Sequence, residues 1–471
     1  MDADIMEPPG TVQIEEWNTI VLQPPPTDDP DDPLNWSKLR KTVNFTLVLL
    51  FTLFTFTLVD IGTVAWGPVN EQLGISFENM NNSFAANLAG LGVCCIFAIP
   101  LAHKYGRRPV YLVSLLVQIA GSIWQAKVMT AWELIVSNVV TGAAGAVSEV
   151  MVQMTVNDLF FVHQRGRANG IYLVMVSMGA YVALVPAGFI TISQGWRWIW
   201  WWCVILIGVT FILFLFFYEE SKYVVTMVGQ GMPHDAGKDM NKSKASLPDD
   251  VPQSTVSKKS YKQRLALITK TDTPVLQHIA QPFQLLFTFP AVTYTAIMYG
   301  SLLCWFSVLA TTQSTYLLNP PYNFSASGIG LFNLSTFIGT VLGSIAGGPF
   351  SDWWNGVPWI VVAVGAAVFG FAFSLIADVS LSYLMDCYED VVGDAFVAVT
   401  FIRNGLSMIF VFCLSPWIAA TGLENMFIAV ACISFTINGI TIPMMIWGKK
   451  ARRAAAGRYR TLAQARRHQP R

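Results

Sequence analysis

Charged residues are scarce in this sequence. Asp, Glu, Lys and Arg make up 12% of its 471 residues, about half the share found in soluble domains, whereas 54% are hydrophobic. So few charges cannot cover a soluble globule of this size, and the formal net charge of zero gives no reason to expect nucleic acid as a partner. The composition therefore argues against an ordinary soluble enzyme and indicates a protein embedded in a lipid bilayer.

Signatures of enzymes and of secreted proteins are also missing. The seven cysteines are scattered without a C-x-x-C pair, and the sequence has no P-loop, dinucleotide-binding or metalloprotease motif. We therefore expect no catalytic residues, no cofactor and no bound metal, and any uphill transport must draw on an ion gradient. The acidic N-terminus lacks the basic-then-apolar order of a cleaved signal peptide, so the first membrane span must act as the insertion signal.

Long apolar runs are abundant. A helix needs about 20 mainly apolar residues to cross the hydrocarbon core, and only helices or closed barrels satisfy the backbone there. Such runs fall at roughly 43–66, 84–102, 110–127, 132–155, 168–190, 197–217, 290–312, 328–350, 357–377, 395–417 and 423–447. We expect an all-α polytopic membrane protein with a cytoplasmic segment 1–42, a six-helix bundle 43–217, a cytoplasmic connector 218–285, a five-span bundle 286–447 and a basic cytoplasmic tail 448–471.

The positions of Lys and Arg disagree with an odd number of spans. Basic residues precede the first span and follow the second, fourth and sixth, which places the N-terminus in the cytoplasm by the positive-inside rule. The tail "GKKARRAAAGRYRTLAQARRHQPR" is the densest basic segment and should be cytoplasmic too, whereas eleven spans would leave it outside. The segment 378–394 carries five acidic residues and cannot be a hidden span. Either one span is missing from the second half, or the topology of that half is unusual.

Two loops carry related motifs in the two halves of the chain. In "PLAHKYGRRPVYL" (100–112), a turn at Gly106 precedes Arg107 and Arg108, which we expect to hold neighbouring helix ends by charge and by bonds to carbonyls. "GGPFSDWWNG" (347–356) takes the equivalent place later in the chain, with Asp352 where the first motif has His103. Both stretches resemble the loop signature of the major facilitator superfamily. That resemblance implies two bundles of six helices, related as parallel repeats.

Further stretches resemble the fungal drug:proton antiporter-like group of that superfamily. They are "DPDDPLNWSKLRK", "FFVHQRGRANGIYL", "GWRWIWWW", "YEESKY", "NPPYNFS" and "FIRNGLSMIFVFCLSPWI", and the resemblance extends from residue 29 to residue 453. In this group an acidic segment like "YLMDCYED" (383–390) follows the tenth span. The run 357–377 therefore matches the tenth span, and the ninth is expected to be missing next to Gly356. This conclusion agrees with the charge argument.

Ionisable residues within spans are costly, so each one is a candidate functional residue. Asp60 in the first span would bind a proton or a cationic substrate, or would pair with a donor from a loop. Glu149 in the fourth span follows two glycines that permit close helix contact, which aims it into the bundle. It would serve either in the transport site or in a bond to a neighbouring helix. Many proton antiporters carry an arginine early in this span, where this chain has Asn138.

The second half offers a basic candidate. Arg403 and Asn404 match an "RN" pair of the resembled group, and Arg403 is the one basic residue in the predicted spans of this half. It would counter an anionic substrate or a partner from the missing helix. An ion pair with Asp394 or Asp386 is the structural alternative.

Most tryptophans fall near predicted span ends. Trp66 and Trp196 are examples, and this position favours an aromatic belt at the membrane interface over a role in a cavity. Trp305 and Tyr299 in the seventh span are the exceptions, and we treat them as candidates for substrate binding.

Two glycosylation sequons, at Asn81 and Asn323, lie in predicted outer loops close to a span.

The leading hypothesis is secondary active transport of a small organic molecule by alternating access, most simply as proton-coupled efflux. Uptake of a cationic nutrient such as a polyamine fits the two acids nearly as well. A third hypothesis is a non-transporting remnant or sensor, because a missing span should disturb the second bundle. The expected partners are a small-molecule substrate, protons and the lipid bilayer. The chain would act as a monomer, in the plasma membrane, with both termini in the cytoplasm if the spans number twelve.

Overall fold

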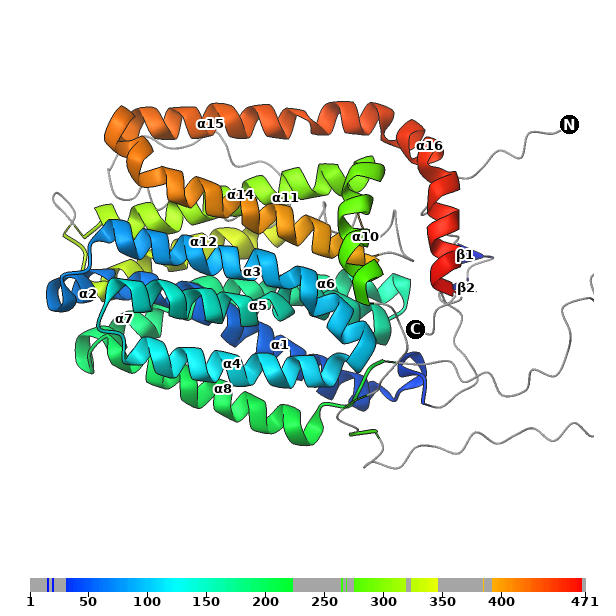
Figure 1. Ribbon diagram of the computed structural model, residues 1–471, viewed down its shortest axis with the longest axis horizontal. Coiled ribbons are helices and arrows are strands. Elements are labelled where there is room, and N and C mark those ends of the chain that lie inside the picture. Colours follow the sequence, from blue (N-terminus) through cyan, green and yellow to red (C-terminus); the bar gives the residue numbers. More distant parts are fainter. Residues whose placement is uncertain are drawn as a thin grey trace, which may run out of the picture.

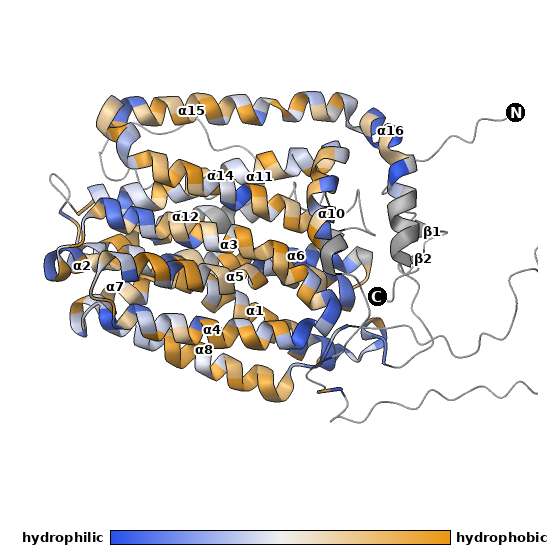
Figure 2. Ribbon diagram, in the orientation of Figure 1, coloured by the Kyte–Doolittle hydropathy of each residue, from blue (hydrophilic) through white to orange (hydrophobic). Residues whose placement is uncertain are grey.

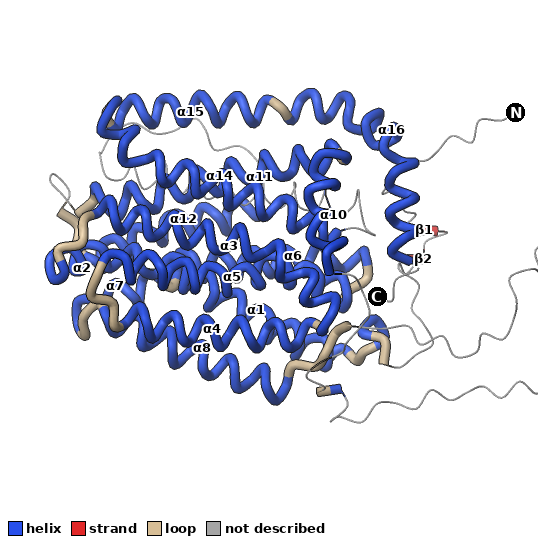
Figure 3. Tube along the Cα trace, viewed as in Figure 1, coloured by secondary structure: helices blue, strands red, loops and turns tan. Residues whose placement is uncertain are grey.

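The computed structural model describes residues 15–16, 19–20, 31–222, 264–265, 268, 275–318, 323–345, 384 and 392–467. These residues form a bundle of long helices that run roughly side by side (Figure 1). Two strands near the N-terminus, β1 (Glu15–Glu16) and β2 (Thr19–Ile20), pair antiparallel with Glu15 opposite Ile20. Helices account for nearly all of the described residues (Figure 3). The prediction of an all-α polytopic membrane protein is confirmed.

The first half contains six membrane-crossing units. Its elements are η1 (Pro33–Asn35), α1 (Lys38–Asp60), η2 (Ile61–Ala65), α2 (Trp66–Leu73), α3 (Phe77–Tyr105), α4 (Arg107–Ala126), α5 (Ala131–Leu159), α6 (Val162–Ser177), the π-helical turn η3 (Met178–Val182), α7 (Leu184–Ser193) and α8 (Arg197–Phe217). The chain from α1 through α2 forms one span, and α6, η3 and α7 form another. Each of the six predicted apolar runs thus coincides with one crossing unit.

The second half contributes α10 (Val275–Thr288), α11 (Pro290–Tyr316), α12 (Ala326–Ile345), α14 (Val392–Thr421), α15 (Leu423–Gly439) and α16 (Thr441–Arg467). Nine helices in the described part of the chain are long and apolar enough to cross a membrane, and α12 adds a shorter apolar stretch. Hydrophobic residues dominate these helices, while hydrophilic ones gather near the ends of the bundle (Figure 2). The region predicted as a polar connector includes helical residues, because α10 begins at Val275.

Helix ends in the first half follow local capping rules. Ser37 accepts a hydrogen bond from the backbone N–H of Arg40 and starts α1. Thr130 and Glu133 form a capping box at the start of α5, where each side chain bonds the other residue's backbone. Gly106 separates α3 from α4 with a φ of 104°, in a region that side chains rarely adopt. The chain therefore leaves one helix and starts the next at small residues or at residues that cap helix ends.

The two halves pack against each other along α3 and α14. Asn81 of α3 donates to the carbonyl of Val411 at 2.8 Å. Further along α3, Cys95 lies against the carbonyl of Val397. Because residue numbers rise along α3 while they fall along α14, the two helices are antiparallel. This pairing places residues of α14 next to the interior of the first half.

One end of the bundle collects the basic loops, and we name it the basic end. It contains the start of α1, the α3–α4 turn at Gly106 and residues 218–222, where Glu219 pairs with Arg40. The C-terminal part of α16 lies at the same end, since Tyr459 contacts Phe289 just before α11. Figure 1 shows α10 and α16 at this end as well.

The helix α12 ends at the basic end, and the helix α14 begins there. Two glycine contacts pair α12 with α7: a Cβ on Gly188 would touch the carbonyl of Ala326, and one on Gly330 would touch the carbonyl of Leu184. The two helices are therefore antiparallel, and α12 runs toward the basic end. Since α14 begins there, α12 ends and α14 starts on the same side. The predicted missing span and Asp352 lie between them, outside the described residues.

Candidate functional site

A buried ion pair joins the two halves in the interior of the bundle. The Arg403 guanidinium of α14 donates to the Glu149 carboxylate of α5, and Asn404 Nδ2 donates to the second carboxylate oxygen at 2.8 Å. Glu149 and Arg403 are each 5% exposed, and Asn404 is fully buried. Tyr299 of α11 is the fourth member of this cluster, and its ring centroid lies 4.7 Å from the Arg403 guanidinium carbon.

Small residues make this meeting possible. A Cβ on Gly142 would overlap the backbone carbonyl of Asn87, so α5 approaches α3 as closely as helices can. A Cβ on Gly92 of α3 would lie 3.0 Å from Asn404 Cβ, which brings α14 equally close on the other face. With α3 thus in contact with both helices, Glu149 of α5 can reach Arg403 of α14. The structure shows this partner for Arg403 in place of the predicted ion pair with Asp394. Asp386, the other predicted partner, lies outside the described residues.

The pair can act as an electrostatic lock. Each ion alone would be costly to bury, so the two charges stabilise each other only while the halves are together. A proton on Glu149 would remove its charge and weaken its bonds to Arg403 and Asn404. The arrangement can therefore convert a protonation event into freedom of the two halves to move.

Asp60 occupies a different place and has a different environment. It is the last residue of α1, 2% exposed, where the span changes from α-helix to the tighter η2. Among the described residues, its Oδ1 has no hydrogen-bond partner, so the predicted bond to a loop donor is not seen. Asp60 is not part of the Glu149 group. A carboxylate buried without a partner favours binding of a proton or a cation.

The aromatic candidates divide between interior and surface. Trp305 is 7% exposed and packs edge-on against Phe410, with no hydrogen-bond partner for its indole N–H among the described residues. Trp198 is 46% exposed, as a belt residue would be. Trp66 and Trp196 are 5% and 3% exposed, so the expectation of an interfacial position is wrong for both. Both side chains line a cavity inside the first half.

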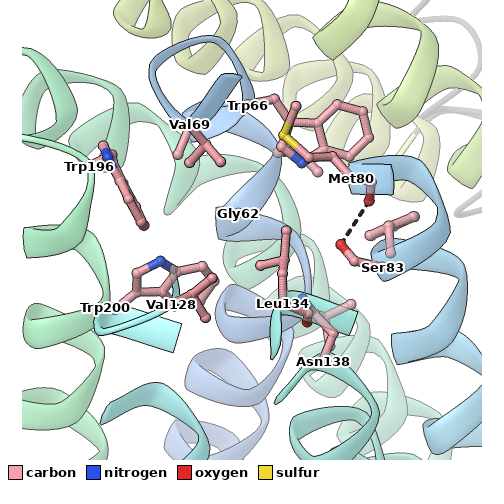
Figure 4. A pocket seen from close by; sticks show the side chains of 14 residues that line it. Gly62, Trp66, Val69, Met80, Ser83, Val128, Leu134, Asn138, Trp196 and Trp200 are labelled. Carbon is pink, nitrogen blue, oxygen red and sulfur yellow. Dashed lines mark hydrogen bonds between the residues drawn. The ribbon is translucent and has the colours of Figure 1, made fainter. Parts of the chain in front are cut away.

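That cavity of about 40 Å³ lies within the first half, between the η2–α2 region, α3, α5 and α8. Figure 4 shows Trp66, Trp196 and Trp200 around it, with Asn138 at one side. Its volume suits a few water molecules and not a drug-sized ligand, which needs several hundred cubic ångströms. Asn138 donates to the carbonyl of Leu134 at 2.9 Å, within its own helix.

The loop motif at the basic end is held by acids. Arg107 is buried and pairs with Asp158 of α5, with Nε 3.1 Å from the carboxylate. The Glu220 carboxylate accepts the backbone N–H groups of Arg107 at 2.9 Å and Arg108 at 3.1 Å, which places a negative charge at the start of α4. Gly106 leaves the room for that carboxylate, since a Cβ there would collide with it.

Arg108 and Lys222 complete this network. Arg108 Nη2 donates to the carbonyl of Leu215 at 2.6 Å, and Lys222 Nζ donates to the carbonyl of His103 at 2.6 Å. Burial lowers the pKa of Lys222 to about 8, the Arg107 charge adds to this shift, and Glu220 opposes it. The network ties the α3–α4 loop to the residues that follow α8.

Sequence reasoning did not identify Asp158, Glu220 or Lys222 as partners of this loop. Glu220 and Lys222 stand in the "YEESKY" stretch, and Asp158 lies in the last turn of α5. An acid that follows a span on the same side as a predicted basic loop is the signal that points to such a pair.

The two glycosylation predictions differ in outcome. Asn81 lies inside α3, 3% exposed, and its amide donates to Val411, so the prediction of an outer loop is wrong there. The apolar run begins at Phe84, but the helix itself begins at Phe77, where Ser76 caps it, and Asn81 in its first turns is buried against α14. Asn323 is exposed at a positive φ just before α12, and its modification stays a prediction. Within the described residues, no cluster of His, Cys, Asp or Glu could hold a metal ion.

Comparison with known proteins identifies the family. A model of the Major Facilitator Superfamily matches residues 46–401. An uncharacterized MFS-type transporter of Schizosaccharomyces pombe, C1271.10c, is 31% identical and aligns with 99% of this chain and 96% of its own length. Protein HOL1 of Saccharomyces cerevisiae is 28% identical, and the MFS transporter fsa7 of a Fusarium species 25%, each over 92% of this chain and 90% of the relative. This chain is a membrane transporter, not an enzyme, and it belongs to the Major Facilitator Superfamily.

Proposed function

We propose that the protein exports a small organic molecule by alternating access, in exchange for protons, with Glu149 as the coupling residue. The observation that carries this proposal is the group of Glu149, Arg403 and Asn404, which bonds one half to the other in the interior of the bundle. In the deprotonated state the group holds the halves together at this level. A proton on Glu149 releases them, and its loss restores the bond.

The chemistry of the cycle needs only proton binding and release. When Glu149 takes up a proton, its carboxylate loses the charge that balances Arg403, and the buried guanidinium keeps the Tyr299 ring beside it but loses its counter-ion. That state is costly, because an uncompensated buried cation destabilises the packed arrangement. The halves relieve the cost by separating, which admits water or substrate to Arg403. Energy from the proton gradient thus reaches the movement of the halves through one ion pair.

A second candidate, uptake of a cationic nutrient such as a polyamine, is favoured by Asp60. Its carboxylate is buried with an unpartnered oxygen, whereas Glu149 is already balanced by Arg403. A protonated amine would supply both the positive charge and the donors that Asp60 lacks. In this version Asp60 binds substrate and Glu149 still carries the proton.

A flux assay tests the coupling. Vesicles that contain the purified chain receive a pH gradient, and transport is followed with rhodamine 6G as the probe for export and radiolabelled spermidine as the probe for uptake. Glu149→Gln mimics the protonated acid and should abolish acceleration by the gradient, whereas Glu71→Gln on the exposed face of α2 should leave it unchanged. A flux that ignores both the gradient and Glu149→Gln refutes coupling through this residue.

The same assay separates the alternatives. Asp60→Asn should eliminate spermidine uptake if Asp60 binds the amine, with the dye flux left intact. A folded chain that moves neither probe in either direction would support the remnant or sensor hypothesis.

We also propose that the natural transporter has twelve spans, with a ninth between α12 and the run 357–377. Two observations support this. The alignment with the Schizosaccharomyces pombe protein extends over 557 positions, more than the 471 residues of this chain, so that protein has segments without a counterpart here. Moreover, α12 and α14 end and begin at the same end of the bundle, which a single crossing between them cannot satisfy. In this form both termini face the cytoplasm, Asn323 carries a glycan, and the protein works as a monomer in the plasma membrane.

A further inference from the structure

One exposed face of α16 changes from apolar to basic along the helix. Ile442 and Ile446 at the start of α16 are 64% and 66% exposed, as expected of residues in contact with lipid chains. One or two turns later the exposed positions are Lys449, Lys450 and Arg453. Helical spacing places all five residues on the same side of α16. A lipid-facing apolar surface thus passes directly into a basic one, and we name Lys449, Lys450 and Arg453 the basic face.

The opposite side of α16 is occupied by the protein. Ala455 is buried there, and the Tyr459 ring lies 6.4 Å from that of Phe289, in an edge-on contact. Ala456, one turn beyond Arg453, is buried as well, so the exposed basic face ends at Arg453. This packing fixes the rotation of the helix about its axis. The basic face therefore points away from the bundle.

The direction of α16 relative to the bundle adds a second constraint. The beginning of the helix continues the line of α15, and the remainder turns across the basic end of the bundle (Figure 1). A helix in this position lies along the membrane surface, at the level where lipid chains give way to headgroups. The exposed Trp447 beside it has the amphipathic ring that favours this interface.

Charge completes the argument. The segment 448–471 contains no Asp or Glu, so no acid within it can neutralise the basic face. We propose that Lys449, Lys450 and Arg453 dock on the headgroups of anionic phospholipids in the cytoplasmic leaflet. Each basic residue near such a surface adds about fivefold to the apparent affinity, so the three together should contribute on the order of a hundredfold. This surface is separate from the transport site. Its placement at the cytoplasmic leaflet rests on the twelve-span topology proposed above, whereas the contact with anionic headgroups does not.

The test uses the full chain in neutral detergent, titrated with short-chain phosphatidylserine while its thermal unfolding midpoint is recorded. The midpoint should rise saturably with phosphatidylserine and should not respond to phosphatidylcholine. In the triple variant K449Q/K450Q/R453Q, the phosphatidylserine concentration for half-saturation should increase on the order of a hundredfold. The variant K449R/K450R keeps the charges and should behave as the parent does.

Two further arms define the outcome. Lys127→Gln removes an exposed basic residue at the other end of the bundle and should leave the titration unchanged. Inorganic phosphate replaces the lipid in a parallel titration and should have no effect at matched concentration. Equal responses to phosphatidylcholine, equal responses to phosphate, or an unaltered titration in the triple variant would each overturn the assignment to anionic lipid.

Discussion

At the scale of single residues, Lys222 is a buried cation at the basic end whose pKa is lowered by its surroundings. Its ammonium group is buried next to Arg107 and donates to the carbonyl of His103. Burial and the neighbouring guanidinium lower its pKa from 10.5 to about 8. Between these two pH values the unfolded chain keeps a proton that the folded chain has released, so the folded state gains stability as the pH rises. Below about pH 8 both states hold the proton, and the cost of burying the charge is constant.

We therefore predict a pH-dependent difference between the parent protein and Lys222→Gln, which keeps a donor but has no charge. As the pH rises from about 8 toward 10.5, the unfolding midpoint of the parent should increase relative to that of the variant. Below this window the difference should not change. Parallel midpoints through the whole window would show that Lys222 titrates normally.

At the scale of elements, the contact between α3 and α5 determines where Glu149 lies. A Cβ on Gly142 would overlap the backbone carbonyl of Asn87, and a Cβ on Gly90 of α3 would overlap the carbonyl of Val139. Neither glycine can take a side chain unless the helices separate. The position of Glu149, two turns beyond Gly142, depends on this spacing.

Gly142→Ala should therefore destabilise the folded chain by about 1 to 3 kcal/mol, the cost of overpacking a tight interface. The matched control is Gly208→Ala in α8, where nothing lies within 4 Å of the added Cβ. Because alanine also favours the helix, the control should be neutral or slightly stabilising. Thermal unfolding in detergent measures both. Equal midpoints for the two variants would contradict the close approach of α3 and α5.

The membrane-crossing helices of the described part could be predicted from the sequence, because a run of about 20 apolar residues has few other structures available in a bilayer. The partner of Arg403 could not. It lies 254 residues away, and the contact depends on α3 fitting between α5 and α14 through Gly92 and Gly142. Hydropathy alone likewise missed the polar first turns of α3, where the buried Asn81 bonds to α14.

At the scale of the whole molecule, the directions of α12 and α14 constrain the number of membrane crossings. The helix α12 runs toward the basic end and α14 begins there, so the chain between them must cross the membrane an even number of times or not at all. The sequence between them offers one apolar run, 357–377.

We predict that the transcript of the source gene contains an in-frame insertion at the codons around Gly356, encoding an apolar run of about 20 residues and its loop. Sequencing of reverse-transcribed RNA across this position measures it directly. A transcript that joins Asn355, Gly356 and Val357 as in this chain would mean that the ninth span is truly absent, and a loss of transport would follow.

The central claim is that Glu149 and Arg403 bond the two halves of the molecule together. A double-mutant cycle with Glu149→Gln, Arg403→Gln and the pair combined tests it by thermal unfolding of the full chain. Each single change leaves a buried group without its partner and should cost about 3 to 5 kcal/mol, while the combined variant should cost less than the sum by about 0.5 to 3 kcal/mol. Arg403→Gln combined with Asp158→Asn, from the separate network at the basic end, should be additive. Additivity for Glu149 and Arg403 as well would show that the two do not interact, and the proposed lock would be wrong.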